Sequence, residues 1–308
     1  MSTTSAPLTP TSDASPGGRK RNGVNGLLWV LTGLAIAAAI VLPLVTREAP
    51  YVYALLLTFP FAIIHGIRRY GWQRLLAFLV ITFVVSNIFE NLSIATGFPF
   101  GHYHYTGSLK LFEVPFTIGL IYFGLGYIAW IAASALLERA DETLGSGSRA
   151  GRINLVALPL LAGAIMTMFD VGSDSSASTV SHTWVWEDGG GFFGVPFTNY
   201  LGWWFVTYVF FQIMALILRR TGPVPVSGVA TPRSHFVQPV LIYGSLGLAS
   251  ISNFIVIPDS LVTDQAGQTW SVAALNETLM TINIFTLVIV AALGLVKVAQ
   301  FTTADPVS

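Results

Sequence analysis

The chain has 308 residues, of which 53% are hydrophobic and only 10% are Asp, Glu, Lys or Arg. An ordinary soluble domain carries about 25% charged residues, so this composition excludes a water-soluble globular enzyme. The 15 basic and 15 acidic residues leave no surplus positive charge for a nucleic-acid partner, and the lack of cysteine excludes disulfides, Cys-ligated zinc and thiol chemistry.

Residues 1–24 are rich in Ser, Thr, Pro and Gly, which is typical of a disordered cytoplasmic tail. Eight apolar stretches follow, each close to the ~20 residues that a membrane-spanning helix needs: 25–45, 51–67, 72–90, 115–137, 153–171, 197–218, 236–257 and 275–299. Backbone groups in lipid must be satisfied internally, which favours helices over strands. We therefore expect an all-α polytopic membrane helix bundle, a single membrane-embedded domain over 25–300, with a short cytoplasmic tail at 301–308.

Lys and Arg lie almost entirely on one side of these predicted spans. Alternate connections hold 13 basic residues on one side and only Arg47 and Lys110 on the other. Because basic loops stay in the cytoplasm, this pattern predicts an N-in, C-in multi-pass protein of the cell (plasma) membrane. Most acids lie toward the outer side, as do two long loops, 91–114 and 172–196, that are rich in aromatics and histidine. Any chemistry is therefore expected in the outer half of the membrane.

The middle of the chain contains an internal repeat, over about 75–135 and 155–215. Three pairs of segments match in register at offsets of 80 or 81 residues: 87–90 with 167–170, 103–105 with 184–186, and 113–117 with 194–198. Both units run through the membrane in the same direction, so we expect them to be related by an axis along the membrane normal. Such an axis would place Glu90 and Asp170 at equivalent depths.

Glu90 and Asp170 are the first candidates for catalysis, because acids within membrane spans are costly and mark functional sites. Their positions at helix C-termini and their apolar surroundings both disfavour the charged form, and two such groups close together would hold one proton between them. Asp174 shares the helix face of Asp170 if the helix continues through Gly172 and Ser173. The alternative interpretation is that these acids are hydrated at the outer interface and only cap loops.

Aromatic residues recur in register in the two outer loops, beside many glycines, which favours shaped loops over a pocket. Aromatic faces can stabilise a cation, although aromatics also gather at membrane interfaces for other reasons. The residues expected to line the pocket and bind substrate are Phe100, Tyr103, Tyr105, Trp184, Trp186, Phe193, Asn199 and Trp203.

Histidines are present in the outer loops and near the cytoplasmic ends of the spans. His102, His104 and His182 fit no usual metal-ligand spacing, so no metal site is expected. His65 and His235 lie at cytoplasmic ends of predicted spans and are interpreted as interfacial residues.

Two strings resemble those of integral-membrane carotenoid biosynthesis proteins, a family that includes γ-carotene 1′-hydratase and bisanhydrobacterioruberin hydratase. The first begins at Glu90 and contains Gly-Phe-Pro-Phe-Gly-His-Tyr-His-Tyr, followed by Val114-Pro115. The second is Phe169-Asp170-x3-Asp174, followed by Trp184-x-Trp186 and Gly-Phe-Phe-Gly-Val-Pro-Phe-Thr-Asn-Tyr-Leu-Gly-Trp203. The likeness covers about residues 75–215. In the family pattern the second acid precedes proline, whereas Asp174 here precedes Ser175.

The resemblance implies acid-catalysed hydration of the terminal isoprenoid C=C of an acyclic or monocyclic carotenoid, which gives a tertiary alcohol and needs no cofactor. Glu90 and Asp170 would share the roles of proton donor and acceptor, with Asp174 or Tyr105 orienting water; which acid donates stays open. The implied partners are the carotenoid lipid substrate, membrane lipid and other carotenoid biosynthesis enzymes.

Two other classes of function compete with a hydratase. A transporter or proton-coupled carrier also uses parallel repeats and membrane acids, but it would need polar residues across the whole membrane. Apart from scattered Ser and Thr, the polar positions here are expected only in the outer half. A non-catalytic lipid- or pigment-binding membrane protein would need the aromatic pocket without the acid pair.

Overall fold

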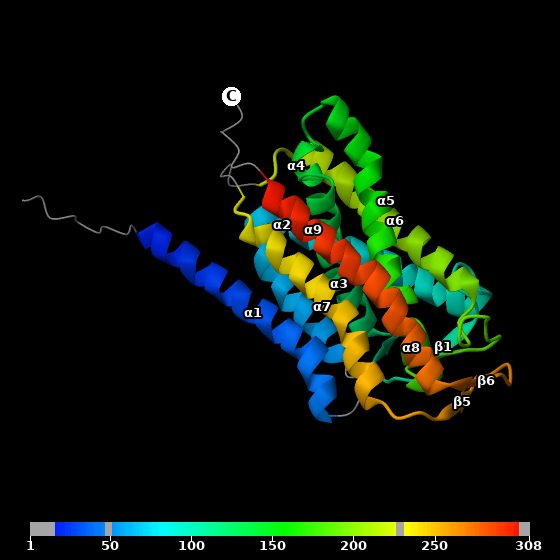
Figure 1. Ribbon diagram of the computed structural model, residues 1–308. Helices are drawn as coiled ribbons and strands as arrows, with labels where there is room; N and C mark the ends of the chain where they lie inside the picture. Colours follow the sequence, from blue (N-terminus) through cyan, green and yellow to red (C-terminus); the bar gives the residue numbers. More distant parts are fainter. Residues whose placement is uncertain (1–15, 47–50, 226–230, 302–308) are drawn as a thin grey trace, which may run out of the picture.

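Long apolar helices make up most of the structure, a computed structural model that describes residues 16–46, 51–225 and 231–301 (Figure 1). Within these residues, seven helices are long and apolar enough to cross a membrane, which confirms the expected all-α polytopic bundle. Their bounds are α1 (Pro16–Thr46), α2 (Tyr51–Thr96), α3 (Phe116–Leu136), α5 (Arg149–Val171), α6 (Phe197–Thr221), α7 (Ser234–Val256), and a last span built from α8 (Val272–Asn283), η2 (Ile284–Val288) and α9 (Ile289–Gln300). A short helix, α4 (Ala140–Thr143), follows α3.

Helix α2 accounts for two of the eight predicted spans. Its 46 residues, at ~1.5 Å each, are about twice the length that a ~30 Å hydrocarbon core requires. The helix breaks at Gly71, whose φ of 77° and ψ of 161° are not helical. A Cβ on Gly66 would lie 2.4 Å from Cδ1 of Leu75, although a straight helix would separate these residues by more than two turns. The chain therefore folds back at Gly71, and the predicted spans 51–67 and 72–90 are the two arms of α2.

The first helix starts earlier than expected. Helix α1 begins at Pro16 instead of near residue 25, so it includes part of the segment predicted to be a tail. Proline is tolerated in the first helical turn, where its missing N–H has no partner to lose. Residues 1–15 and 302–308, the remainder of the two predicted tails, lie outside the described residues.

The strands of the described residues form three short antiparallel pairs. Two of the pairs are local hairpins, β2 (Lys110–Leu111) with β3 (Val114–Pro115) and β5 (Leu261–Thr263) with β6 (Thr269–Ser271). The third pair joins the two repeat units through β1 (Tyr103–Tyr105) and β4 (Trp184–Trp186).

The pairing of β1 with β4 is symmetric in a way that the repeat explains. Tyr103 pairs with Trp186, Tyr105 pairs with Trp184, and the central pair joins His104 to Val185, which are equivalent residues in the repeat. An antiparallel pair centred on equivalent residues is the arrangement that a two-fold axis produces. The geometry therefore agrees with the predicted parallel repeat.

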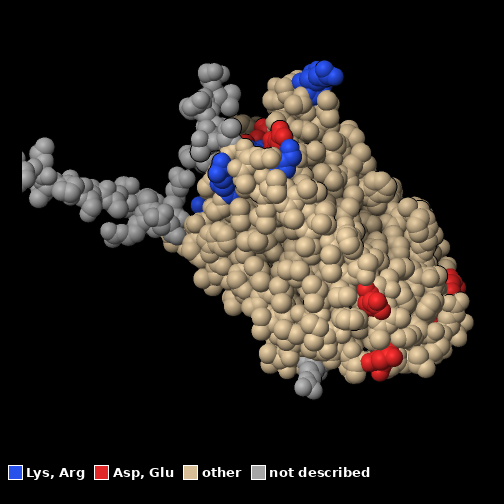
Figure 2. All heavy atoms as spheres, viewed as in Figure 1, with Lys and Arg blue, Asp and Glu red and all other residues tan. Residues whose placement is uncertain are grey.

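Helix α3 lies at the centre of the bundle, where α2, α5, α7 and α9 pack against it. Small residues permit this close packing; for example, a Cβ on Gly124 would lie 2.2 Å from Oγ1 of Thr58. The outer helices instead turn large apolar side chains outward, among them Leu34, Val41 and Leu293. In the view of Figure 2, Lys and Arg gather at one end, only Asp and Glu are seen at the opposite end, and the belt between them is uncharged. The chain is thus a multi-pass membrane protein.

A buried polar cluster lies beside α4, at the cytoplasmic end of the predicted topology. Arg69 is buried and donates to both oxygens of Asp141, at 2.7 Å from Nε and 2.7 Å from Nη2. Tyr70 and Ser134 also donate to Asp141. Burial disfavours the charge on Asp141, but Arg69 and these hydrogen bonds outweigh burial and hold the pKa of Asp141 below its usual value. The cluster is fully paired and ties α4 to α2.

The histidines predicted to be interfacial are buried, so that expectation is wrong. His65 Nδ1 lies 2.6 Å from the Tyr127 hydroxyl, and Nε2 lies 2.7 Å from the carbonyl oxygen of His235. The two imidazole rings stack with centroids 3.5 Å apart. The expectation that polar positions occur only in the outer half is therefore also wrong. At the cytoplasmic end, the buried polar residues are His65, His235, Arg69 and Asp141. Arg69 and Asp141 satisfy one another, so they can be buried at modest cost, and single-residue hydropathy does not register such pairing.

Candidate active site

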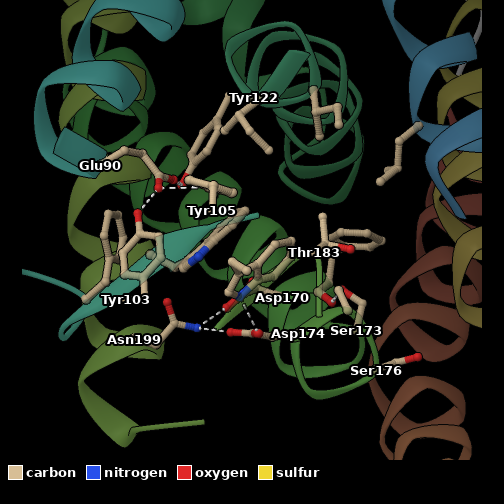
Figure 3. A pocket seen from close by; sticks show the side chains of 18 of the residues that line it. Glu90, Tyr103, Tyr105, Tyr122, Asp170, Ser173, Asp174, Ser176, Thr183 and Asn199 are labelled. Atoms are coloured by element: carbon tan, nitrogen blue, oxygen red, sulfur yellow. Dashed lines mark hydrogen bonds between the residues drawn. The ribbon is translucent and has the colours of Figure 1, made fainter. Parts of the chain in front are cut away.

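A cavity of about 290 Å³ lies between the two repeat units and contains all three acids singled out from the sequence, Glu90, Asp170 and Asp174 (Figure 3). Its remaining walls are mainly aromatic and aliphatic. Each of the three acidic residues is 3% exposed or less. This burial does not fit the alternative interpretation, in which the acids are hydrated at the outer interface.

Glu90 is surrounded by three tyrosine hydroxyls. Oε2 accepts hydrogen bonds from Tyr103 and, at 3.0 Å, from Tyr105, while Oε1 accepts one from Tyr122 at 2.7 Å. Tyr103 and Tyr105 are alternate residues of β1, so their side chains lie on one face of the strand. Burial raises the pKa of both Tyr103 and Tyr105 well above its usual value, and the neighbouring Glu90 raises it further. Both phenols therefore stay protonated and act as donors.

Asp170 and Asp174 are joined through one amide. Asn199 Nδ2 lies 2.7 Å from Oδ2 of Asp170 and 2.6 Å from Oδ2 of Asp174. The other oxygen of Asp174 accepts from the indole N–H groups of Trp184, at 2.9 Å, and Trp186, at 3.4 Å. Asp174 thus has three donors, whereas Asn199 is the side chain that donates to Asp170.

The two aspartates lie together because the helix is only briefly interrupted between them. Helix α5 ends at Val171, a turn at Gly172 and Ser173 follows, and helical structure resumes at Asp174 and continues into the π-helical turn η1 (Ser176–Val180). The predicted sharing of one helix face by Asp170 and Asp174 is therefore present in the structure.

Aromatic side chains from both repeat units form the wall around the carboxyl groups. Tyr103 packs on Trp186 with ring centroids 4.8 Å apart, and Tyr105 packs on Trp184 at 6.0 Å. Seven of the eight residues predicted to bind substrate line the cavity: Phe100, Tyr103, Tyr105, Trp184, Trp186, Asn199 and Trp203.

Phe193 is the predicted pocket residue that does not line the cavity. Its ring packs on Trp270 of β6, with centroids 5.3 Å apart, and on Phe192. Its carbonyl oxygen accepts a hydrogen bond of 2.5 Å from Thr179 in η1. Phe193 therefore holds the outer loop against η1 and the β5–β6 hairpin.

Tyr122 is a site residue that the sequence reasoning missed, because it lies inside a span that was read only for its hydropathy. Its ring stacks on Trp203 with centroids 4.9 Å apart and planes 17° apart. Tyr122 and Trp203 are 81 residues apart, the offset of the repeat, so extending the alignment into the returning helices would have drawn attention to it.

The outer-loop histidines lie apart from the carboxyl groups of the cavity. His104 is exposed, and its Nδ1 lies 3.4 Å from Oε1 of Glu187. Within the part of the chain that the structure describes, no group of three or more His, Cys, Asp or Glu residues is arranged to hold a metal ion.

Comparison with known proteins gives a match to one family model. The model described as "carotenoid biosynthesis protein" matches residues 50–263, more than half of the chain. This stretch contains both repeat units and every side chain that bonds to Glu90, Asp170 or Asp174. No curated protein and no solved structure gave a match.

Proposed function

The chain belongs to the family of carotenoid biosynthesis proteins, and we propose that it is a hydratase that adds water to the terminal isoprenoid C=C of an acyclic or monocyclic carotenoid. The product is a tertiary alcohol. The observation that carries this proposal is the presence of three buried carboxyl groups and a wall of aromatic faces in one apolar cavity. Hydration requires a proton donor, a proton acceptor and stabilisation of a carbocation, and these residue types supply all three.

The first step is protonation of carbon. Two adjacent carboxylates disfavour each other's ionisation, so the Asp170–Asp174 pair holds one proton. Asp174, with donors from Asn199, Trp184 and Trp186, is the better stabilised as a carboxylate, which assigns the proton to Asp170. Asp170 gives this proton to the chain-side CH carbon of the double bond, whose π electrons form the new C–H bond. The positive charge then rests on the tertiary carbon, facing the aromatic rings.

The second step is capture of the cation by water. A water molecule forms the new C–O bond, and Glu90 accepts the proton that the water loses. Three tyrosine hydroxyls donate to Glu90, which suits a carboxylate that acts as a base. Transfer of this proton from Glu90 back to Asp170 restores the starting state, so one water is consumed and no cofactor is required.

The size of the cavity suits the end of a long polyene. About 290 Å³ is at the lower limit of small-molecule sites, which is enough for a chain terminus and not for a whole carotenoid. The remainder of the substrate would lie along the apolar helices in the lipid. A substrate held in this way is a carotenoid lipid, which we propose as the partner. We also propose that the protein lies in the plasma membrane.

The packing between the cavity and the cytoplasmic polar cluster favours an enzyme over a carrier. Tyr122 packs on Phe210, Phe210 on Phe211, and Phe211 on Trp130. The indole N–H of Trp130 then donates to the hydroxyl of Tyr70 in the buried polar cluster beside α4. Phe210, Phe211 and Trp130 are almost completely buried. A proton-coupled carrier needs polar groups along its path, and this aromatic layer interrupts such a path.

Expression of the protein in cells that accumulate lycopene, γ-carotene or a C50 precursor tests the proposal. Mass analysis of extracted pigments should show products heavier by one water, because a terminal double bond becomes a tertiary alcohol. Cells that carry the empty vector provide the control. Absence of any such product with all three substrates would contradict the hydratase assignment.

A further inference from the structure

The interruption in helix α5 between Asp170 and Asp174 is contacted by the last membrane span. Asn283, at the end of α8, donates through Nδ2 to the carbonyl oxygen of Gly172 at 2.9 Å. Both residues are buried, and 111 residues separate them in the chain. The last carbonyls of a helix lack partners within the helix, so the Asn283 amide satisfies a backbone group at the point where α5 ends.

Gly172 fits this contact because of space and not because of backbone conformation. Its φ of −85° and ψ of 0° are open to other residues. A Cβ at this position, however, would lie 1.9 Å from Oδ1 and 2.7 Å from Cγ of Asn283. The amide of Asn283 therefore occupies the volume that any side chain at 172 would need.

A π-helical turn accompanies the contact on each of the two helices. The turn η1 follows Asp174, and the turn η2 begins immediately after Asn283. A π-helical turn is rare, accommodates an extra residue and is frequent at functional sites. The contact between Asn283 and Gly172 thus lies where both helices depart from regular α-helical geometry.

We propose that Asn283 is a positioning residue: by holding the Gly172 carbonyl, it sets the spacing at which Asp170 and Asp174 both accept from the Asn199 amide. Gly172 lies between the two aspartates in sequence, so a displacement of its backbone changes the relative positions of both carboxyl groups. The inference rests on the proposed function for its catalytic consequence. Asn283 itself does not line the cavity and acts only through α5.

Kinetics of purified variants test this role. Asn283→Leu keeps the approximate shape but removes the donor, and kcat is expected to fall about tenfold with KM within about twofold of wild type, because catalytic geometry changes while the aromatic wall stays intact. Gly172→Ala should show the same kcat-selective loss, since its methyl group displaces Asn283. The double variant Gly172→Ala/Asn283→Ala should be no worse than Asn283→Ala alone, because the smaller side chain leaves room for the methyl group.

The matched control is Asn154→Leu. Asn154 lies at the opposite end of α5, where its amide donates to Thr143 Oγ1 at 2.9 Å. This variant also removes an amide hydrogen bond from α5 but leaves Gly172 untouched, so its kcat should stay at the wild-type value. Equal losses of kcat in Asn154→Leu and Asn283→Leu would show a general effect on helix packing and would overturn the proposal.

A measurement without substrate separates this inference from the proposed function. The indole N–H groups of Trp184 and Trp186 donate to Asp174, so their nitrogen-15 NMR signals, assigned with Trp→Phe variants, report the position of its carboxyl group. Asn283→Leu should shift these signals, and Asn154→Leu should not. Unshifted signals in Asn283→Leu would overturn the positioning role whatever the wild-type activity is. If Asn283→Leu shifts these signals but the wild-type protein makes no hydrated product, only the hydratase assignment is contradicted.

Discussion

Replacement of Asp170 by asparagine should abolish formation of the hydrated carotenoid, with a fall in kcat of at least about a thousandfold. Asparagine has nearly the same size but cannot supply a proton to carbon. Asp174 cannot take over this role, because the indoles of Trp184 and Trp186 and the amide of Asn199 stabilise its carboxylate. The loss is measured by product formation per mole of folded protein in purified membranes.

The matched control for this substitution is Asp188→Asn. Asp188 is an exposed acid of the second outer loop, close in sequence to the cavity but outside its lining. It should keep wild-type activity. If Asp170→Asn retained more than a tenth of the wild-type rate while folding normally, Asp170 would not be the proton donor.

Glu90→Gln should also suppress the product, by about a hundredfold or more. Glutamine cannot accept the proton of the attacking water. Its amide also has one acceptor oxygen where Glu90 accepts from three tyrosines, so at least one buried hydroxyl loses its partner. The expected kinetic signature is a large fall in kcat.

Glu113→Gln is the corresponding control, since Glu113 is an exposed acid of the first outer loop. Its rate should match that of the wild type. A Glu90→Gln protein with an unchanged rate would remove Glu90 from the mechanism, and it would leave the hydration reaction to the aspartate pair alone.

Much of the architecture could be predicted from the sequence because lipid imposes simple constraints. Hydropathy located the spans, and the repeat brought Glu90, Asp170 and the two aromatic loop segments to one place. The β1–β4 pair and the shared cavity follow from that repeat. Hydropathy predicts the two spans 51–67 and 72–90 but not how they connect, so it does not predict the sharp turn of α2 at Gly71.

The details that escaped prediction depend on contacts between distant segments. Asn199 was expected to bind substrate, but the structure shows that its amide also joins Asp170 to Asp174. The contact of Asn283 with Gly172 joins residues 111 positions apart, and no local sequence pattern predicts such a contact. The inner cluster of Arg69 and Asp141 was missed for the same reason, because its burial depends on pairing and not on the polarity of either residue alone.

Isotope labelling of the product tests the central claim, acid-catalysed hydration, most directly. The purified wild-type protein would convert its carotenoid substrate in D2O and, separately, in water enriched in heavy oxygen. The account predicts one non-exchangeable deuterium on the carbon next to the tertiary alcohol, and a hydroxyl oxygen that comes from water. A product without that deuterium, or with an oxygen from another source, would contradict protonation of carbon followed by capture of water.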